Sequence, residues 1–197
     1  MPWAVALADF KKDPSPILPI LEQLKTDLSS YVRKSVANNI NDISKTHPGL
    51  VVELAKYWLG NNKHTDWIIK HGCRTLLKKG NQEVLSLFGH SGGGMVEVDG
   101  FSLGAVPVSI GGNLVFSFSI EAKQSTKVRL EYGIDFVKAT KKTSQKIFKI
   151  SEISLKEGQK KDYIKSHSFA DLSTRKHYPG IHSLALIVNG KQACAKT

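Results

Sequence analysis

The first 90 residues place apolar side chains at helical spacing. Within residues 30–46 one apolar stripe is formed by Val32, Val36, Ile40 and Ile43. Their spacing of three and four predicts an amphipathic helix with this stripe facing a core. A neighbouring face of the same helix would carry polar side chains together: Lys34, Asn38, Asn41, Asp42 and Lys45. We interpret this polar face as the working surface of the protein.

Further helices follow the same pattern and repeat along the chain. They are predicted over residues 14–24, 48–59, 65–80 and 82–88. Asp13 is the expected cap of the first of these, and Thr65 or Asp66 the expected cap of the third. Pro14 and Pro48 begin successive units 34 residues apart, and helix pairs at that period are typical of an α-α solenoid.

The apolar period changes from about 3.6 to 2 after the run Ser91-Gly92-Gly93-Gly94. Strands are predicted over residues 96–103, 105–110, 114–120, 128–136, 147–155, 160–166, 181–188 and 191–195, with a hairpin turn at Asn189-Gly190. Such short alternating strands fit an antiparallel β-sandwich. We therefore expect an α + β chain with helical repeats in residues 1–90, a Gly-rich linker in 91–95 and a β-sandwich in 96–197.

The charge balance points to a polyanionic partner. The net charge is +11, and both parts are basic: residues 1–90 carry 12 Lys and Arg against 8 Asp and Glu, and residues 91–197 carry 16 against 9. Nucleic acid is the first candidate and an anionic membrane surface the second. Two cysteines, Cys73 and Cys194, give no disulfide framework, and no apolar window is long enough to span a membrane. We expect a soluble, cytoplasmic protein.

Motifs for metals and cofactors are missing from the sequence. It has no His-Glu-x-x-His or Cys-x-x-Cys, so no metal site is expected. The glycine runs lack the Lys-Ser/Thr of a phosphate-binding P-loop and are interpreted as linker and turn. We predict no cofactor, and the residues leave the oligomeric state open.

Three segments carry a family resemblance: Arg33–Ile43, Trp67–His71 and Arg74–Gly80. With them, the chain resembles bacterial DNA alkylation repair glycosylases of the HEAT-like repeat superfamily, specifically the AlkC branch. Some members of that branch add an immunoglobulin-like (Ig-like) domain after the repeats. The resemblance implies HEAT-like helical repeats followed by an Ig-like β-sandwich. It also implies excision of cationic N-alkylpurines such as 3-methyladenine from double-stranded DNA, on the bacterial nucleoid.

The same resemblance implies helical repeats ahead of Trp3, one of which supplies another acidic active-site residue. The sequence holds no such repeats. We expect either a fragment or a truncated relative that binds without catalysing. The alternative to a glycosylase is a non-enzymatic DNA-binding or scaffold protein built on the same helices.

Asp42 is the expected catalytic carboxylate. A cationic base is already a good leaving group, so the need is to stabilise the developing positive charge on the sugar and to position water. Between Lys34 and Lys45, the carboxylate would stay ionised. The alternative is an exposed helix aspartate paired with a lysine one turn away. By resemblance, Trp3 occupies the position of an active-site tryptophan; the alternative is a residue that packs a helix end.

Basic side chains on the second helices of aligned repeats would form one positive strip. The expected DNA contacts there are Arg33, Lys34, Asn38, Lys45, Lys70, Arg74 and Lys78, with Lys79 beside them. Arg74 is the best single candidate because a guanidinium holds phosphate with two bonds. The alternative for any lysine is solvated surface, and Asn38 and Asn41 either orient phosphate or water or are surface amides.

Aromatic residues of the helical part are expected mainly in its core. Trp58 and Trp67 fall on apolar stripes, although Trp67 could reach the groove from the start of its helix, and His71 fits a packed histidine better than a base. In the β part, Lys141 and Lys142 lie in one predicted loop and Arg175 and Lys176 in another. Either loop could enter a DNA minor groove, as the resemblance implies; the alternative is charge that protects sheet edges.

Overall fold

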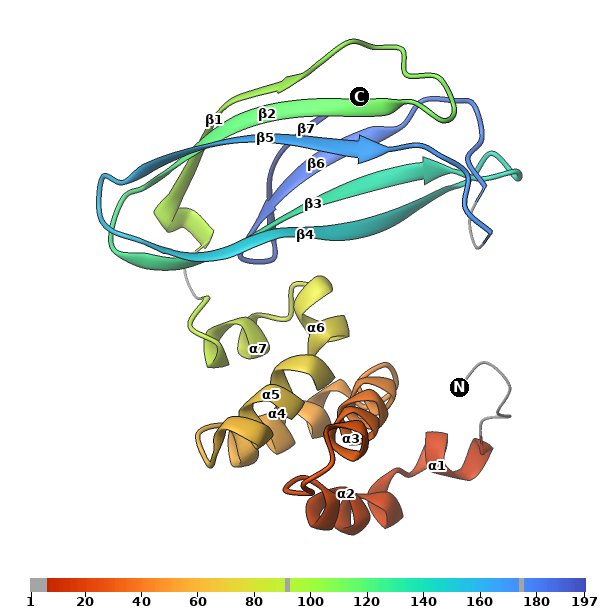
Figure 1. The fold of residues 1–197 in the computed structure, drawn as a ribbon, viewed down its shortest axis with the longest axis vertical. Helices are drawn as coiled ribbons and strands as arrows, with labels where there is room; N and C mark the ends of the chain where they lie inside the picture. Colours follow the sequence, from red (N-terminus) through yellow and green to blue (C-terminus); the bar gives the residue numbers. More distant parts are fainter. Residues whose placement is uncertain (1–6, 91–92, 174–175) are drawn as a thin grey trace. The chain divides into compact units, whose positions relative to one another are not determined.

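The computed structural model describes residues 7–90, 93–173 and 176–197. The chain divides into two compact units, Met1–Phe88 and Gly89–Thr197. The first is built from helices and the second from strands (Figure 1). Each unit has its own hydrophobic core, so each is described by itself.

The helical unit contains these elements in order: α1 Ala8–Lys12, η1 Ser15–Ile17, α2 Leu18–Leu24, α3 Ser30–Ile43, α4 Pro48–Trp58, α5 Lys63–Gly72, α6 Arg74–Lys78 and α7 Gln82–Leu87. The helix expected over 65–80 is divided at Cys73 into α5 and α6. Its expected start was wrong. Asn62 caps α5 by accepting hydrogen bonds from the backbone N–H groups of His64 and Thr65, and the Thr65 hydroxyl accepts one from Asn62 N–H in return.

The predicted apolar stripe of α3 faces the core of the helical unit. Val36, Ile40 and Ile43 are buried, as is the intervening Ala37, whereas Val32 is only partly buried. Gly72, the last residue of α5, lies directly against this stripe: a Cβ placed there would come within 2.8 Å of Ile40 Cγ2. The missing side chain at Gly72 therefore allows α3 and α5 to approach closely, which sets the spacing of the surface that they share.

The second unit is made of two antiparallel sheets. Its strands are β1 Val96–Leu103, β2 Asn113–Ala122, β3 Thr126–Val137, β4 Thr143–Leu155, β5 Lys160–Ser168, β6 Ser183–Val188 and β7 Lys191–Lys196, after a short 3-10 turn η2 Gly93–Met95. The strand orders are β1-β2-β5 and β4-β3-β6-β7. Phe116 of β2 and Tyr132 of β3 have ring centroids 5.1 Å apart, so the two sheets share one core.

One predicted strand is wrong, and one predicted turn is confirmed. Residues 105–110 lie in the connection from β1 to β2, with Val106 and Ile110 exposed. Pro107 has no N–H to offer a neighbouring strand, which works against pairing there. The hairpin at Asn189-Gly190 forms as expected, with φ of 47° and 75° at the two residues. Among the described residues, none of the helices is both long and apolar enough to span a bilayer.

Candidate nucleic-acid interface

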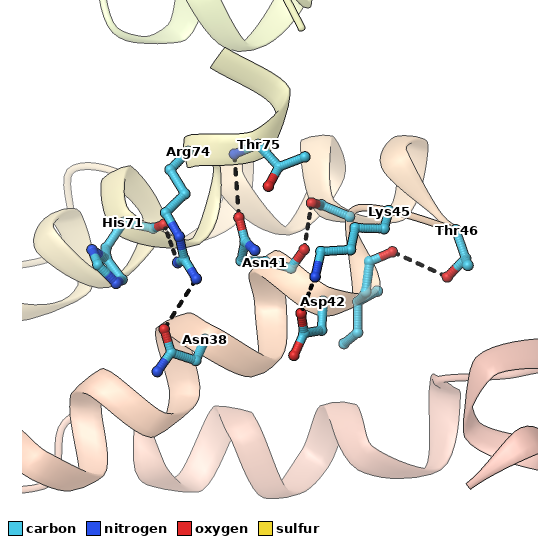
Figure 2. A network of polar contacts seen from close by, with 10 residues as sticks. Asn38, Asn41, Asp42, Lys45, Thr46, His71, Arg74 and Thr75 are labelled. Atoms are coloured by element: carbon cyan, nitrogen blue, oxygen red, sulfur yellow. Dashed lines mark hydrogen bonds and ion pairs between the residues drawn. The ribbon is translucent and has the colours of Figure 1, made fainter. Parts of the chain in front are cut away.

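Arg74, the first residue of α6, bridges α3, which carries the predicted polar face, and α5. Its Nη2 donates to Asn38 Oδ1 of α3 at 3.1 Å, and its Nη1 donates to the His71 carbonyl of α5 at 2.8 Å (Figure 2). These bonds hold the guanidinium over the seam between α3 and α5. A guanidinium has five N–H donors, so three remain for an anion. The two bonds therefore fix the guanidinium in place and leave it donors for a further partner.

Asn41 does not project from this surface, contrary to the sequence-based expectation. Its side chain is buried, with 4% of the residue exposed, and its Oδ1 accepts from the Thr75 N–H at 3.2 Å. Thr75 lies in the first turn of α6, where backbone N–H groups have no partner within the helix. Asn41, which precedes Thr75 by 34 residues in the sequence, therefore caps α6 (Figure 2). It fixes the start of the helix whose first residue is Arg74.

Asp42 lies one turn after Asn38 on the exposed side of α3. Its carboxylate Oδ1 is 2.5 Å from Lys45 Nζ, and the two side chains are 68% and 55% exposed (Figure 2). This ion pair is the one expected if Asp42 is simply an exposed helix aspartate paired with a lysine one turn away. A pair so exposed contributes little stability. A bound ligand can therefore separate the two groups at little cost, and the carboxylate remains open to solvent.

The other predicted phosphate contacts of the helical unit differ in their surroundings. Arg33 donates from Nη1 to the carbonyls of Asp27, at 2.5 Å, and Leu28, at 3.0 Å, so its guanidinium secures the loop before α3. Lys34, Lys70 and Lys78 are exposed on α3, α5 and α6, as is Lys79 beside them. The structure thus places Arg74, Asn38 and the exposed lysines on three neighbouring helices, α3, α5 and α6, whereas Arg33 serves the local backbone.

The aromatic residues of the helical unit separate into core and surface. Trp58 is fully buried, as predicted. Trp67 is not a core residue: it is 46% exposed, and its indole stacks on the His71 imidazole with centroids 5.1 Å apart and planes 6° from parallel. Burial lowers the pKa of His71 from its ordinary 6.5, and the charges of Arg74 and Lys34 lower it further. His71 is therefore neutral at pH 7.

The signal for this stacked pair is present in the sequence. Trp67 and His71 are four residues apart, which places them on one face of a helix. Their spacing also fits a core stripe, so the pattern alone does not distinguish a buried pair from an exposed one. The difference arises from how α5 packs, because the core takes up Ile68 and Ile69 instead.

Two predicted site residues, Trp3 and Arg175, lie outside the described residues. In the β unit, Lys141 and Lys142 lie in the turn between β3 and β4, and Lys176 lies in the connection from β5 to β6. The connection from β5 to β6 lies against the end of β3, where that turn begins. A Cβ at Gly180 would lie 3.1 Å from Val137 Cγ2, at the end of β3. The two basic loops, proposed from sequence as alternatives, therefore occupy the same end of the β unit.

Metal and thiol chemistry have little support in the described part of the chain. No group of three or more His, Cys, Asp or Glu residues there is arranged to hold a metal ion. Cys73 is completely buried, and burial raises the pKa of its thiol to about 12. It stays protonated at neutral pH and is unsuited to act as a nucleophile.

Comparison with known proteins identifies the family. A family model described as "Uncharacterised protein YhaZ, C-terminal Ig-like domain" matches residues 97–197. The protein YhaZ of Bacillus subtilis (strain 168) is 51% identical over 191 residues, which are 97% of this chain. The chain belongs to the YhaZ family. The matched residues form the β unit of this chain, which therefore corresponds to the domain that the family model describes as Ig-like.

A solved structure extends this likeness to the helical unit. Pseudomonas fluorescens alkylpurine DNA glycosylase AlkC, bound to DNA containing an abasic site analogue, matches 98% of the chain with a TM-score of 0.95 and 37% identity. The resemblance to AlkC inferred from sequence is confirmed. The chain spans about half the length of both relatives, 54% of YhaZ and 55% of AlkC.

Proposed function

We propose that this YhaZ-family chain is a DNA alkylation repair protein. It binds double-stranded DNA that carries alkylated bases and hydrolyses the N-glycosidic bond of cationic N-alkylpurines such as 3-methyladenine. The likeness to AlkC, at 37% identity over nearly the whole chain, supports the assignment. The observation that carries it is the surface of α3 and α6, where Arg74 is bonded to Asn38 and the exposed Asp42 lies one turn further along α3.

The proposed architecture gives each unit a role. We propose that α3 and α5 are the second helices of successive HEAT-like repeats in an α-α solenoid within residues 1–90. Residues 91–95 are the linker and residues 96–197 an Ig-like β-sandwich. The packing of α5 on α3 supports the repeat, because Gly72 of α5 lies against Ile40, 32 residues earlier. Two bonds from α6 to α3 have a similar separation: Arg74 to Asn38 and Thr75 to Asn41. The protein works in the cytoplasm, on the nucleoid.

Asp42 supplies the electrostatic part of the reaction. As the bond from sugar C1′ to the base nitrogen breaks, the bonding electrons pass to the cationic base, which leaves neutral, and positive charge develops on the sugar. The Asp42 carboxylate stabilises that charge. A water molecule then adds its oxygen to C1′, and its proton passes to Asp42 and on to solvent. DNA that covers the open carboxylate displaces water and strengthens this interaction. By resemblance, Trp3 lies against the cationic base.

The basic residues hold the DNA backbone. Arg74 is the proposed bidentate phosphate ligand, and charge around it comes from Lys34, Lys45, Lys70 and Lys78. Arg33 positions the loop before α3 and borders this strip. In the β unit, the contacts proposed are Lys141, Lys142, Arg175 and Lys176.

Base release is the direct test. Release of 3-methyladenine from methylated DNA is measured for the wild type, for Asp42→Asn and for Glu53→Gln, which removes an exposed carboxylate of α4 that is likewise paired with a lysine. We expect Asp42→Asn to lower the single-turnover rate by about a hundredfold or more. Glu53→Gln should match the wild type. Equal rates for all three would overturn the role of Asp42.

The second candidate function is non-enzymatic DNA binding. The ion pair between Asp42 and Lys45 favours it, because such a pair also fits a simple solvated helix face. Tight binding to methylated DNA without any base release by the wild type would support this alternative over the glycosylase.

A further inference from the structure

The stacked Trp67 and His71 have no part in the chemistry proposed for Asp42. An indole that is nearly half exposed is costly to leave in water, because an aromatic side chain of this size gains much from burial. His71 covers one face of the indole, so the open surface belongs to its other face and its edge. The pair is rigid as well, since parallel stacking fixes the orientation of both rings.

The surroundings of the pair are basic. Arg74 donates to the backbone carbonyl of His71 itself, and the charge of Lys34 acts on the imidazole. Lys70, one turn from Trp67 on α5, is exposed. An apolar plate beside cations matches a nucleic-acid strand, in which an apolar sugar alternates with a charged phosphate.

The pairing of α3 with α5 places this plate relative to Asp42. Gly72 of α5 lies against Ile40 of α3, 32 residues before it, and the charge of Arg33 acts on His64, near the start of α5. The two helices therefore run in the same direction, and Trp67 is level with the turn of α3 around Ser35. Asp42 is seven residues further along α3, so Trp67 lies about 10 Å from the level of Asp42 at 1.5 Å per residue. This is about three base steps of DNA at 3.4 Å each.

We propose that the Trp67–His71 pair is a binding plate for a deoxyribose of the DNA backbone, several base steps away from the sugar that faces Asp42. The plate rests on the proposed function and deepens it, because it fixes where along the DNA the damaged site lies. Trp67 is a positioning residue: it contacts DNA away from the reacting atoms. Bases in the flanking duplex are stacked on one another, so their faces are covered. The deoxyribose is then the apolar surface that the indole can contact.

Binding to duplexes of different flank length tests the plate. Each duplex carries an abasic-site analogue with flanks of about eight base pairs, and in two further duplexes one flank or the other is cut to about two, shorter than the reach from Asp42 to Trp67. Affinities are measured for the wild type, Trp67→Ala, Trp67→Phe and Tyr57→Ala. Tyr57 is an exposed aromatic residue of α4 and serves as the matched control.

With both flanks long, Trp67→Ala should weaken binding about tenfold, within the range for aromatic contacts to nucleic acid. The same loss should appear with one of the shortened duplexes and disappear with the other, in which the plate has no DNA to bind. Trp67→Phe should lose less, and Tyr57→Ala nothing. If Trp67→Ala is poorly folded by thermal melting, the comparison is made with Trp67→Phe.

Two results would overturn the plate: wild-type affinity in both Trp67 variants, or an equal loss with all three duplexes, which would indicate a general disturbance of the site. The test does not depend on base release. If the flank-dependent loss appears while the wild type releases no 3-methyladenine, the proposed catalysis fails and the plate stands. If release is normal and the Trp67 variants bind as the wild type does, only the plate fails.

Discussion

Asn41 offers the sharpest test of how the interface is held. Replacing it by alanine removes the acceptor for Thr75 N–H and leaves that group without its partner at the start of α6. Loss of a helix cap, or of one hydrogen bond in a partly buried setting, costs about 1–2 kcal/mol. Because Arg74 begins α6, Asn41→Ala should also displace the guanidinium from Asn38 and weaken DNA binding.

Urea unfolding followed by far-ultraviolet circular dichroism measures the effect on the helices. At typical denaturant dependences for a unit of this size, a loss of 1–2 kcal/mol lowers the midpoint of helix unfolding by about 1 M, with the slope unchanged. Asn41→Asp is the matched control, because its carboxylate still accepts from Thr75 N–H and lies favourably at a helix N-terminus. An unchanged midpoint in Asn41→Ala would refute the cap.

Other variants of the helical unit have expected outcomes of their own. Gly72→Ala places a methyl group against α3 and should lower the unfolding free energy by about 1–3 kcal/mol. Gly49→Ala is the control: no atom lies within 4 Å of its Cβ, so it should be neutral or stabilising. Denaturant melts compare the two, and equal stability of both variants would contradict the close approach of α3 and α5. The pKa of His71 is lowered in the folded state, so its contribution to stability is present above the ordinary pKa of 6.5. It is lost as the pH falls from 6.5 through the lower pKa of the folded state, because the unfolded chain takes up the proton first. Urea melts at pH values from above to below 6.5 should show this loss of unfolding free energy in the wild type and a smaller loss in His71→Gln. The same dependence of the unfolding free energy on pH in both proteins would contradict the role of His71. Lys45→Ala and Asp42→Asn should each change the unfolding free energy by less than about 0.5 kcal/mol because the pair is exposed, and a larger loss would mean that the pair is structural.

Local patterns predicted the helical unit well because its helices bury regular stripes. The spacing of Val36, Ile40 and Ile43 located the buried side of α3, and all three are in the core. The repeat period led to the expectation that second helices lie side by side, and Gly72 of α5 does lie against Ile40 of α3. The solenoid itself stays a prediction. Such predictions succeed because helix geometry decides them within a few turns.

The errors arose where a distant partner decides the outcome. Asn41 looked like surface because amides favour water, yet its partner is a backbone N–H 34 residues away. Trp67 looked like core because its spacing fits a stripe, and only the packing of α5 leaves it exposed. In the β unit, the apolar run at Val106 and Ile110 resembled a strand, and it stays unpaired in the connection between β1 and β2.

The roles proposed for Asp42, Trp3 and the basic residues stay predictions, because they concern contacts with DNA. The structure does distinguish among the basic residues. It separates Arg33, which holds a loop, from Arg74, whose guanidinium lies over the seam between two helices. It also brings the two basic loops of the β unit to one end.

The salt dependence of DNA binding tests the central claim most directly. Affinity for a duplex with an abasic-site analogue is measured over a range of salt concentrations for the wild type and for a variant with three cations of the α3, α5 and α6 surface changed to glutamine: Lys34, Arg74 and Lys78. A control variant removes the same charge elsewhere on the helical unit: Lys11, Lys12 and Lys56. Each lost phosphate contact lowers the slope of log affinity against log salt by about 0.9, so the first variant should lose about two to three from the slope, and the control should keep the wild-type slope. Identical slopes in the wild type and both variants would contradict the proposal that this surface holds DNA.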